Sequence, residues 1–394
     1  MGVKKLLPKV ALDPEVLYKL YQDIIAPVED TLHGAQRVLV VADGALYNLP
    51  LEMLVTAYGE PEQRAFRQAH RDADGSSAKQ PRLGEYATLP YLADRYRFSY
   101  LPSLAALVSQ RNYPKPPVPL TRNLVAFADP IFQPEKGKSP AKPASAATKG
   151  YSAATQAALQ LLARSVNVQI PRLPETADEV RAMDKIVGAN SQLYLRDKAQ
   201  EYTAKDLANK GDLNGLRYLV FSTHGLLGGE FLAVQQAQKP ATTLSLDRPF
   251  PVVPVEKRGQ PALVLTLVGD LHGEDGLLTM SEVLGLDINT DLVVLSACNT
   301  AGEKPNQGEG FVGLTRSFLY AGARRLLVSH WPVGSESTRD LMVATFTQLQ
   351  AGQTPLDALT EARRQLRGRT WNSPSGPVSL AHPYFWAPFV VVGD

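Results

Sequence analysis

The amino-acid sequence predicts an α/β fold built on a mostly parallel sheet that helices cover. Strand-like and helix-like segments alternate along most of the chain, an order that is typical of parallel strands joined by helices. Residues 263–267 and 292–296 are almost continuously apolar, as strands are when both faces of their sheet are buried. The chain has 394 residues, which is enough for two or three domains with a sizeable core.

The first part of the chain already shows this alternation. Residues 14–26 carry one apolar stripe and predict an amphipathic helix. Residues 37–42 predict a buried strand, which a turn and a short apolar segment follow. Residues 58–87 are polar and charged, so we expect a surface loop there. The remaining elements of this part are strands at 98–101 and 123–127 and a helical segment at 104–109.

A linker is predicted near the middle of the chain. Residues 132–149 contain almost nothing that could enter a core. We therefore expect an N-terminal part at residues 1–131, a linker at 132–150 and a C-terminal part at 151–394.

The C-terminal part continues the alternation. A helix at 177–188 is preceded by Thr176, and Thr176 and Glu179 have the spacing of a capping box, which satisfies the free N–H groups of a first helical turn. The other predicted helices are 152–165, 309–321, 335–350 and 355–367, and the predicted strands are 218–221, 263–267, 292–296, 325–329 and 389–392.

The composition excludes several classes of partner and location. The 41 basic and 39 acidic residues leave a net charge of +2, which is too small to attract nucleic acid or an anionic membrane. The N-terminus lacks the apolar core of a signal peptide and no run of about 18 apolar residues occurs, so we expect a cytoplasmic protein without a membrane partner. A single cysteine, Cys298, cannot form an internal disulfide framework or a zinc site of several thiolates.

Two reactive side chains follow two of the predicted strands. His224 comes after the strand at 218–221, and Cys298 comes after the strand at 292–296. Ligands and catalytic groups gather beyond the carboxyl ends of parallel strands, so the two side chains lie near each other if their strands are neighbours. A thiolate attacks a carbonyl carbon readily, and an imidazole beside it can activate the thiol and protonate the leaving amine. The pair predicts a cysteine hydrolase.

The surroundings of the two residues suit this chemistry. Gly225 lets a substrate approach the backbone closely, and its N–H and that of Cys298 are candidates for holding an oxyanion. Small residues next to Cys298 leave room for a substrate chain. A competing interpretation stays open, since a lone cysteine at a strand end is often a small buried hydrophobe and a lone histidine is often only hydrogen-bonded.

A glycine pattern at residues 308–313 fits the G-x-G-x-x-G fingerprint of dinucleotide sites. It begins well after the strand that ends at Ser296, and the next strand ends in Ser329-His330 rather than in an acid that would bind a ribose. We therefore expect a helix start with close packing there and no cofactor. The remaining histidines lack ligand-like spacing, so we also expect no metal.

Six spaced segments of the C-terminal part carry a stronger signal, and they lie at residues 222–225, 275–279, 295–301, 308–323, 329–333 and 382–389. In this order they resemble the CHAT family of caspase-like cysteine peptidases, which is related to caspases and separase and is often joined to tetratricopeptide repeats. The resemblance covers nearly the whole chain, because the first part is similar to the opening region of that family at residues 43–52, 91–96 and 126–130.

The resemblance implies two tandem caspase-like halves. The half at 1–131 has no catalytic dyad, and the half at 151–394 carries His224 and Cys298. A caspase-like site needs no cofactor and acts on a protein substrate. The repeats that accompany the family imply a regulatory sensor or a tetratricopeptide-repeat partner.

Two departures from the family pattern affect the expected substrate pocket. After Trp331-Pro332-Val333 this chain has Gly334 and Ser335 before Glu336, where the family commonly has acidic residues at once. An insertion at 228–260 lengthens the segment between the two catalytic candidates. The candidate pocket residues are Ser296, Trp331, Ser335 and Glu336, and for Trp331 a packed core position is the competing interpretation.

These observations favour a cysteine endopeptidase that cuts protein substrates through His224 and Cys298 under the control of a partner or sensor. The alternative is a catalytically silent caspase-like module that only binds partners. The reactivity of Cys298 distinguishes the two, because a silent module leaves this thiol no more reactive than a model thiol.

Overall fold

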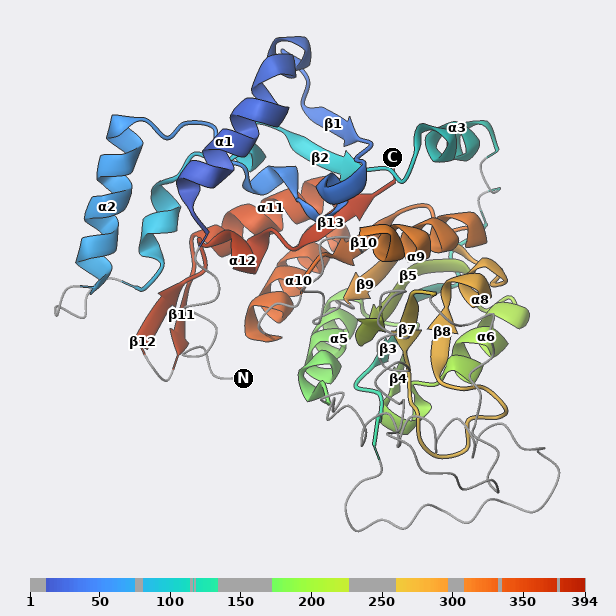
Figure 1. Cartoon of the computed structure of the whole chain (residues 1–394). Helices are drawn as coiled ribbons and strands as arrows, with labels where there is room; N and C mark the ends of the chain where they lie inside the picture. Colours follow the sequence, from blue (N-terminus) through green and yellow to red (C-terminus); the bar gives the residue numbers. More distant parts are fainter. Residues whose placement is uncertain are drawn as a thin grey trace, which may run out of the picture. The chain divides into compact units, whose positions relative to one another are not determined.

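The computed structural model describes residues 12–74, 81–113, 116, 118–133, 172–226, 260–296, 308–331, 335–373 and 376–393 (Figure 1). The chain divides into two compact units. Unit 1 combines residues 1–103 with residues 332–392, and unit 2 comprises residues 104–331 together with Gly393. Unit 1 thus joins the N-terminal and the C-terminal segments of the chain.

Unit 1 contains a parallel sheet. Strand β2 (Arg97–Tyr100) pairs with β1 (Arg37–Val40) on one side and with β13 (Phe389–Val392) on the other. Its helices are α1 (Pro14–Ile24), α2 (Glu60–Asp74), α10 (Ser335–Gln350), α11 (Pro355–Arg367) and α12 (Pro383–Trp386). The antiparallel pair β11 (Thr370–Ser373) and β12 (Gly376–Ser379) and 3-10 turns at Ala26–Leu32, Gly44–Asn48, Leu51–Met53, Gly84–Thr88 and Leu92–Asp94 complete the unit.

A buried ion pair connects the parts of unit 1. The side chains of Arg363 and Glu52 are 4% and 1% exposed, and Nη1 of the arginine lies 2.9 Å from Oε1 of the glutamate. The Tyr100 hydroxyl donates to Oε2 of Glu52 at 2.6 Å, and Arg363 also donates to the carbonyl oxygen of Phe389. The network therefore holds β2, α11 and β13 together, although these elements are far apart in the sequence.

Part of the segment at 58–87, for which the sequence predicts a loop, is helical. Glu60–Asp74 form helix α2. Most of its residues are Glu, Gln, Arg and Ala, which are strong helix formers. Phe66 packs edge-on against Tyr58 and Tyr86, with ring centroids 6.4 and 5.3 Å away. The prediction was wrong because it relied on the polarity of the segment. It did not take account of the helix propensity of these residues or of the packing of Phe66.

Unit 2 contains a larger parallel sheet in the order β10-β9-β5-β3-β4. Its strands are β3 (Arg122–Ala128), β4 (Ser191–Leu195), β5 (Asn214–Ser222), β9 (Asn289–Ser296) and β10 (Leu326–Ser329). Its helices are α3 (Leu104–Asn112), α5 (Pro174–Val187), α6 (Glu201–Asn209), α8 (Met280–Leu284) and α9 (Gly308–Ala321), with a 3-10 turn at Arg196–Lys198. The parallel pairing confirms the predicted α/β fold class.

A row of stacked aromatic rings crosses this sheet. Phe127 of β3 lies between Tyr194 of β4 and Phe221 of β5, with centroid distances of 5.0 and 5.1 Å. Phe318 of α9 packs on Phe221 at 5.8 Å. Aromatic cross-strand pairs stabilise sheets beyond the area that they bury, so this row helps to select the strand neighbours.

A second sheet in unit 2 is antiparallel. It consists of β6 (His224–Leu226), β7 (Ala262–Val264) and β8 (Leu277–Thr279), with β7 in the middle. The apolar run at 263–267, predicted to be a parallel strand, overlaps β7, so its predicted direction was wrong. The apolar side chains of this segment are buried, as predicted. An apolar run reports burial and carries no information on strand direction.

The start of helix α5 also differs from the prediction. The helix begins at Pro174 after Leu173, so Thr176 lies inside the first turn and no capping box forms. Proline is favoured at the first helical position because its missing N–H has no helical partner to lose there. The Thr176 hydroxyl instead donates to the carbonyl oxygen of Leu173 at 2.7 Å. Glu179 is therefore available for another contact.

Several predicted features lie outside the described residues, among them the helix at 152–165, the linker beyond residue 133 and the insertion before Gln260. Strand β3, which the predicted boundary assigns to the N-terminal part, pairs with β4 and β5. The boundaries at 131 and 151 and the two tandem halves stay predictions. In the part of the chain that the structure describes, no helix is both long enough and apolar enough to cross a bilayer.

Candidate active site

The carboxyl ends of β5 and β9 lie side by side, as the predicted site requires. Ser222 ends β5 and Ser296 ends β9, and the two serines are register partners in the parallel pair. On the other side of β9, Ser329 ends β10. Its hydroxyl donates a hydrogen bond to the carbonyl oxygen of Leu295 at 3.2 Å. Three neighbouring strands thus end together in serine residues.

His224 lies two residues beyond the end of β5. It begins β6, pairs with Val264 of β7 and is only 8% exposed. The hydroxyl of Thr223 donates to the carbonyl oxygen of Val264, and the ring of Phe132 packs on the imidazole with centroids 5.3 Å apart. The backbone and the aromatic contact together restrict the position of the imidazole.

The other candidate residues are placed as follows. Gly225 is partly buried and pairs with Leu263, and Ser296 is partly exposed at the end of β9. Cys298 lies outside the described residues, which stop at Ser296 on this side. The structure therefore brings the two strand ends together and leaves the distance between the imidazole and the thiol open.

The remaining pocket candidates are divided between the two units. Trp331 follows β10 in unit 2, is partly buried, and has its ring centroid 6.5 Å from that of His330. Ser335 and Glu336 belong to unit 1, where they form the first turn of α10, and Glu336 is exposed. Their part in a substrate pocket stays a prediction.

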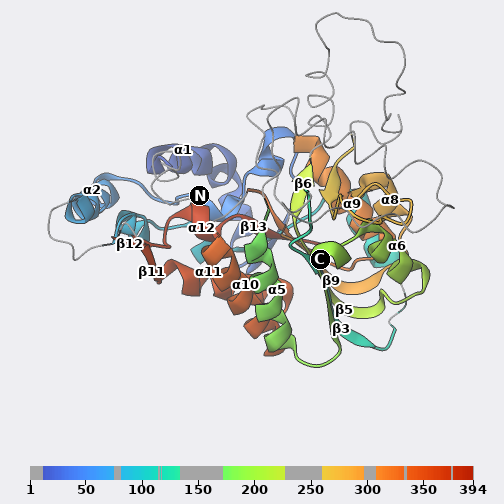
Figure 2. The ribbon, with the colours of Figure 1, turned by 90° about the horizontal axis from the view of Figure 1, so that it is seen from below.

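A functional candidate that the sequence analysis does not identify is Glu179. This residue of α5 is buried, with 4% of its surface exposed. The Ser222 hydroxyl donates to its Oε2 at 3.2 Å, and the Ser296 hydroxyl also interacts with the carboxyl group. Burial raises the pKa of Glu179 to about 7, although both serine hydroxyls act in the opposite direction. Figures 1 and 2 both show α5 beside the strands that the glutamate reaches.

A signal for Glu179 is present in the sequence. The buried face of α5 includes Ala177, Val180 and Met183, and Glu179 shares that face. A carboxylate on the apolar face of a helix needs a polar partner inside the protein, because burying it alone is costly. The capping-box interpretation supplied a local partner and so concealed this requirement.

Helix α5 is anchored at the neighbouring strand end as well. The hydroxyl of Thr176, one turn before Glu179, accepts the backbone N–H of Asp129 at 2.8 Å. Asp129 follows β3, and its buried carboxylate accepts two hydrogen bonds from Arg172 at 2.8 and 2.7 Å. Arg196 lies 3.6 Å from the same carboxylate. The helix therefore contacts the ends of β3, β5 and β9 along one face.

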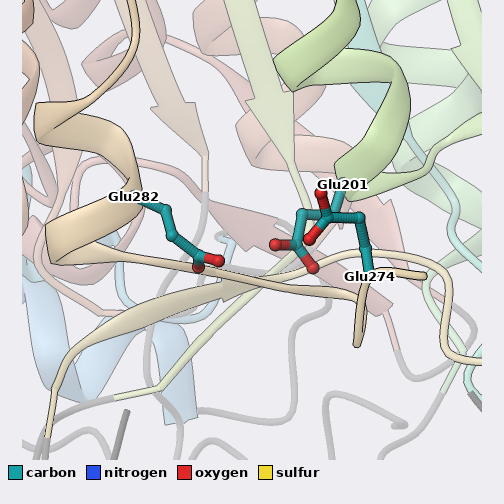
Figure 3. A group of neighbouring side chains, drawn as sticks. All are labelled: Glu201, Glu274 and Glu282. Carbon is teal, nitrogen blue, oxygen red and sulfur yellow. The ribbon is translucent and has the colours of Figure 1, made fainter. Parts of the chain in front are cut away.

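A group of three carboxylates in unit 2 has the geometry of a cation site. Glu201, Glu274 and Glu282 point toward one another, and their ligand oxygens lie within 4.8 Å (Figure 3). The ammonium of Lys205 lies 2.6, 2.7 and 2.8 Å from them, respectively. Burial opposes the charge of this lysine, but the carboxylates outweigh it and raise its pKa. The lysine thus supplies the positive charge that a metal ion would supply.

The carboxylate and lysine group supports the small sheet that carries His224. The backbone N–H of Gly276 donates to Oε2 of Glu201 at 2.8 Å, directly before β8 begins. Glu282 accepts from both the backbone N–H and the hydroxyl of Thr279, which caps α8. Because β8 pairs with β7 and β7 pairs with β6, the group fixes the far edge of that sheet.

The glycine pattern at 308–313 lies in helix α9, which begins at Gly308. A Cβ atom at Gly313 would lie 2.7 Å from the sulfur of Met280 in α8. The expectation of a helix start with close packing is confirmed. Glycine at this position lets α9 and α8 approach each other.

The fold and the strand-end residues define a mostly parallel α/β protein whose histidine candidate lies directly beyond the sheet. The family model of the CHAT domain matches residues 14–394. The chain therefore belongs to the CHAT domain family. The family to which the sequence analysis assigned the chain is thereby confirmed.

The chain is similar to part of a tetratricopeptide repeat protein. Human tetratricopeptide repeat protein 28 is 33% identical over 118 residues, and the mouse protein of the same name is 32% identical over the same length. These matches cover 30% of this chain and 4% of each relative. The chain therefore spans a small part of the length of these relatives.

Two solved structures show more distant likeness. A chain of the Saccharomyces cerevisiae separase–securin complex is 14% identical at a TM-score of 0.37, covering 77% of this chain and 14% of that chain. The Arg-specific cysteine proteinase gingipain R is 8% identical at a TM-score of 0.41, covering 95% of this chain and 69% of that chain. Neither likeness is close enough to identify site residues.

Proposed function

We propose that this protein is a cysteine endopeptidase with Cys298 as nucleophile and His224 as general acid and base. The observation that carries the proposal is the register pairing of Ser222 with Ser296. Each serine stands two positions before one of the two reactive residues in the sequence, so His224 and Cys298 follow the ends of two neighbouring strands. Membership of the CHAT domain family supports this proposal.

The proposed reaction has two steps. The Cys298 thiol gives its proton to His224, and its sulfur forms a bond to the carbonyl carbon of the substrate. The backbone N–H groups of Gly225 and Cys298 hold the oxyanion, the C–N bond breaks, and His224 returns the proton to the leaving amine. Water then attacks the thioester, His224 takes a proton from it, and the proton returns to the released thiolate. No cofactor enters this reaction.

The surroundings of His224 support this role. The imidazole is buried beside an apolar cluster that includes Phe132, Val264 and Leu277. Exclusion of water strengthens the interaction between an imidazole and a nearby thiolate, because the local dielectric constant is low. A histidine in this position favours activation of a neighbouring thiol.

The test compares wild type, Cys298→Ala and His224→Ala on a peptide library. Cleavage by wild type and loss of cleavage in both variants, with unchanged circular dichroism, supports the proposal. Full cleavage by Cys298→Ala overturns it. Labelling with iodoacetamide is a second readout: a Cys298 that reacts no faster than a model thiol supports the silent binding module instead.

We further infer that a protein partner regulates the enzyme, because relatives of this chain include tetratricopeptide repeat proteins. The expected result is that the complex purified from native cells cleaves the library faster than the chain alone. Equal rates for the complex and the isolated chain contradict this inference.

A further inference from the structure

We propose that Glu179 is a positioning residue whose carboxyl group bridges the ends of β5 and β9, the two strands that precede His224 and Cys298 in the sequence. This inference rests on the proposed function and deepens it. The glutamate does not contact substrate in this scheme. It acts through the two serines that precede the reactive residues.

The geometry places one carboxyl group at both strand ends. Oε2 of Glu179 accepts from Ser222 at 3.2 Å, and Ser296 interacts with the same carboxyl group. The two serines are register partners, so the carboxyl group bridges across a single rung of the parallel ladder. A change in the separation or register of the two strands breaks at least one of these contacts.

The helix that carries the glutamate is itself held in place. Thr176 accepts the backbone N–H of Asp129, and Asp129 accepts a bidentate pair of hydrogen bonds from Arg172. Ala128, directly before Asp129, is the register partner of Ser222. The contacts of Thr176 and Glu179 therefore lie at the carboxyl ends of three adjacent strands, within one residue of a single row, and a shift of α5 would break them.

The cost of this arrangement indicates a role beyond packing. Oε1 of Glu179 is buried and has no hydrogen-bond partner among the described residues. A buried polar atom without a partner costs about 1–3 kcal/mol, and an apolar side chain of similar size would avoid that cost. Unlike an apolar side chain, the glutamate can accept hydrogen bonds from the two serines.

Among the described residues, the charged groups around Glu179 do not neutralise it. Glu175 on the same helix raises its pKa further. At the end of β3, Asp129 is already paired with Arg172 and Arg196. At the end of β5, His224 lies two residues beyond Ser222. With a pKa of about 7, a large fraction of the glutamate is protonated near neutral pH, and glutamine is then its closest neutral mimic.

The experiment compares Glu179→Gln and Glu179→Ala, with Asp178→Asn as the matched control. Asp178 is the preceding residue of α5, but its side chain is 66% exposed and it pairs only with Arg181 among the described residues. The first readout is the rate at which iodoacetamide labels Cys298, the single cysteine, between pH 5.5 and 9. The second is hydrogen exchange of the amides of residues 220–226 and 292–296.

In the alanine variant, iodoacetamide should label Cys298 at least about tenfold more slowly near pH 7, because misplacement of a catalytic group lowers rates by this much or more. The backbone amides at both strand ends should exchange faster than in wild type. In the glutamine variant, iodoacetamide should label Cys298 at a rate within about threefold of wild type at pH 6. Any inflection that the wild-type rate shows near pH 7 should be absent from this variant. The Asp178→Asn control should match wild type.

Wild-type labelling and exchange in the alanine variant would overturn the positioning role, as would equal losses in the glutamine and alanine variants. A wild-type Cys298 with the reactivity of a model thiol would instead contradict the proposed peptidase. In that case the exchange readout still tests the bridge, so the two failures are distinguishable.

Discussion

Ser222 and Ser296 are direct register partners on adjacent parallel strands, and their hydroxyl groups both interact with the buried carboxyl group of Glu179. Each serine precedes a reactive residue by two positions, so a single rung of the sheet relates the histidine candidate to the cysteine candidate.

Replacement of Glu179 by glutamine should change how stability depends on pH. The native pKa of about 7 lies above the ordinary value of 4.5, so the native state binds more protons than the unfolded state between these values. Stability from this group is complete below pH 4.5 and is lost as the pH rises through 7. As the pH rises from 4 to 8, the free energy of unfolding of Glu179→Gln should increase by about 3 kcal/mol relative to that of wild type, as measured by urea unfolding. Parallel stability curves would contradict the raised pKa.

Replacement of Gly276 by alanine should destabilise the small sheet beside His224. Gly276 has φ of +83°, and a Cβ atom there would lie 2.6 Å from the carbonyl oxygen of Thr266. Gly269, with φ of +94° and nothing within 4 Å of a Cβ atom, is the matched control. Gly269→Ala should cost about 1–2 kcal/mol for the left-handed backbone. Gly276→Ala should cost about 1–3 kcal/mol more, measured by thermal unfolding. Equal losses of stability in the two variants would show that the structure adjusts to relieve the contact between the new Cβ atom and the Thr266 carbonyl oxygen.

Replacement of Arg363 by methionine should strongly destabilise unit 1. The substitution leaves the buried carboxylate of Glu52 without its cation, and breaking a buried pair in this way costs about 3–5 kcal/mol. Arg364→Met is the control on the same helix, because Arg364 is exposed and pairs with Glu361 at the surface. The control should change urea unfolding very little. A similarly small effect of Arg363→Met would mean that water reaches Glu52.

Replacement of Lys205 by methionine should destabilise unit 2 in a pH-dependent way. It leaves Glu201, Glu274 and Glu282 close together without their shared cation. The cost at pH 7 should be about 2–3 kcal/mol, below that of a fully buried pair because the lysine is partly exposed. Because the pKa of Lys205 is raised, wild type keeps this contribution at neutral pH and loses it only in alkali.

The pH dependence of the Lys205→Met variant provides the check. Acidification should restore part of the lost stability, since protonation removes the repulsion among the carboxylates. Lys210→Met, which removes an exposed lysine paired with Asp206, should show no such recovery. A Lys205→Met variant that is equally destabilised at pH 5 and pH 7 would contradict the electrostatic explanation.

Much of the candidate site follows from local pattern. The apolar runs at 218–221 and 292–296 predict two buried strands, and the sequence alone shows that His224 and Cys298 follow closely after them. That the two strands are neighbours does not follow from either run. The parallel pairing of β5 with β9 in the folded sheet establishes it.

Other features could not be predicted because their determinants lie far apart in the chain. The run at 263–267 is apolar for either strand direction, and only its pairing with β6 and β8 makes β7 antiparallel. Helix α2 is stabilised by the contact of Phe66 with Tyr86, 20 positions away, which a window of local polarity does not include.

The sequence by itself determined the α/β class, the family and the two reactive residue types, because alternation, composition and spaced motifs are properties of neighbouring residues. The tertiary structure alone decided the contacts of Glu179. Its partners Ser222 and Ser296 lie 43 and 117 positions further along the chain, and only folding brings their hydroxyls to one buried carboxyl group. The same burial raises its pKa, since the interior solvates a charge poorly compared with water.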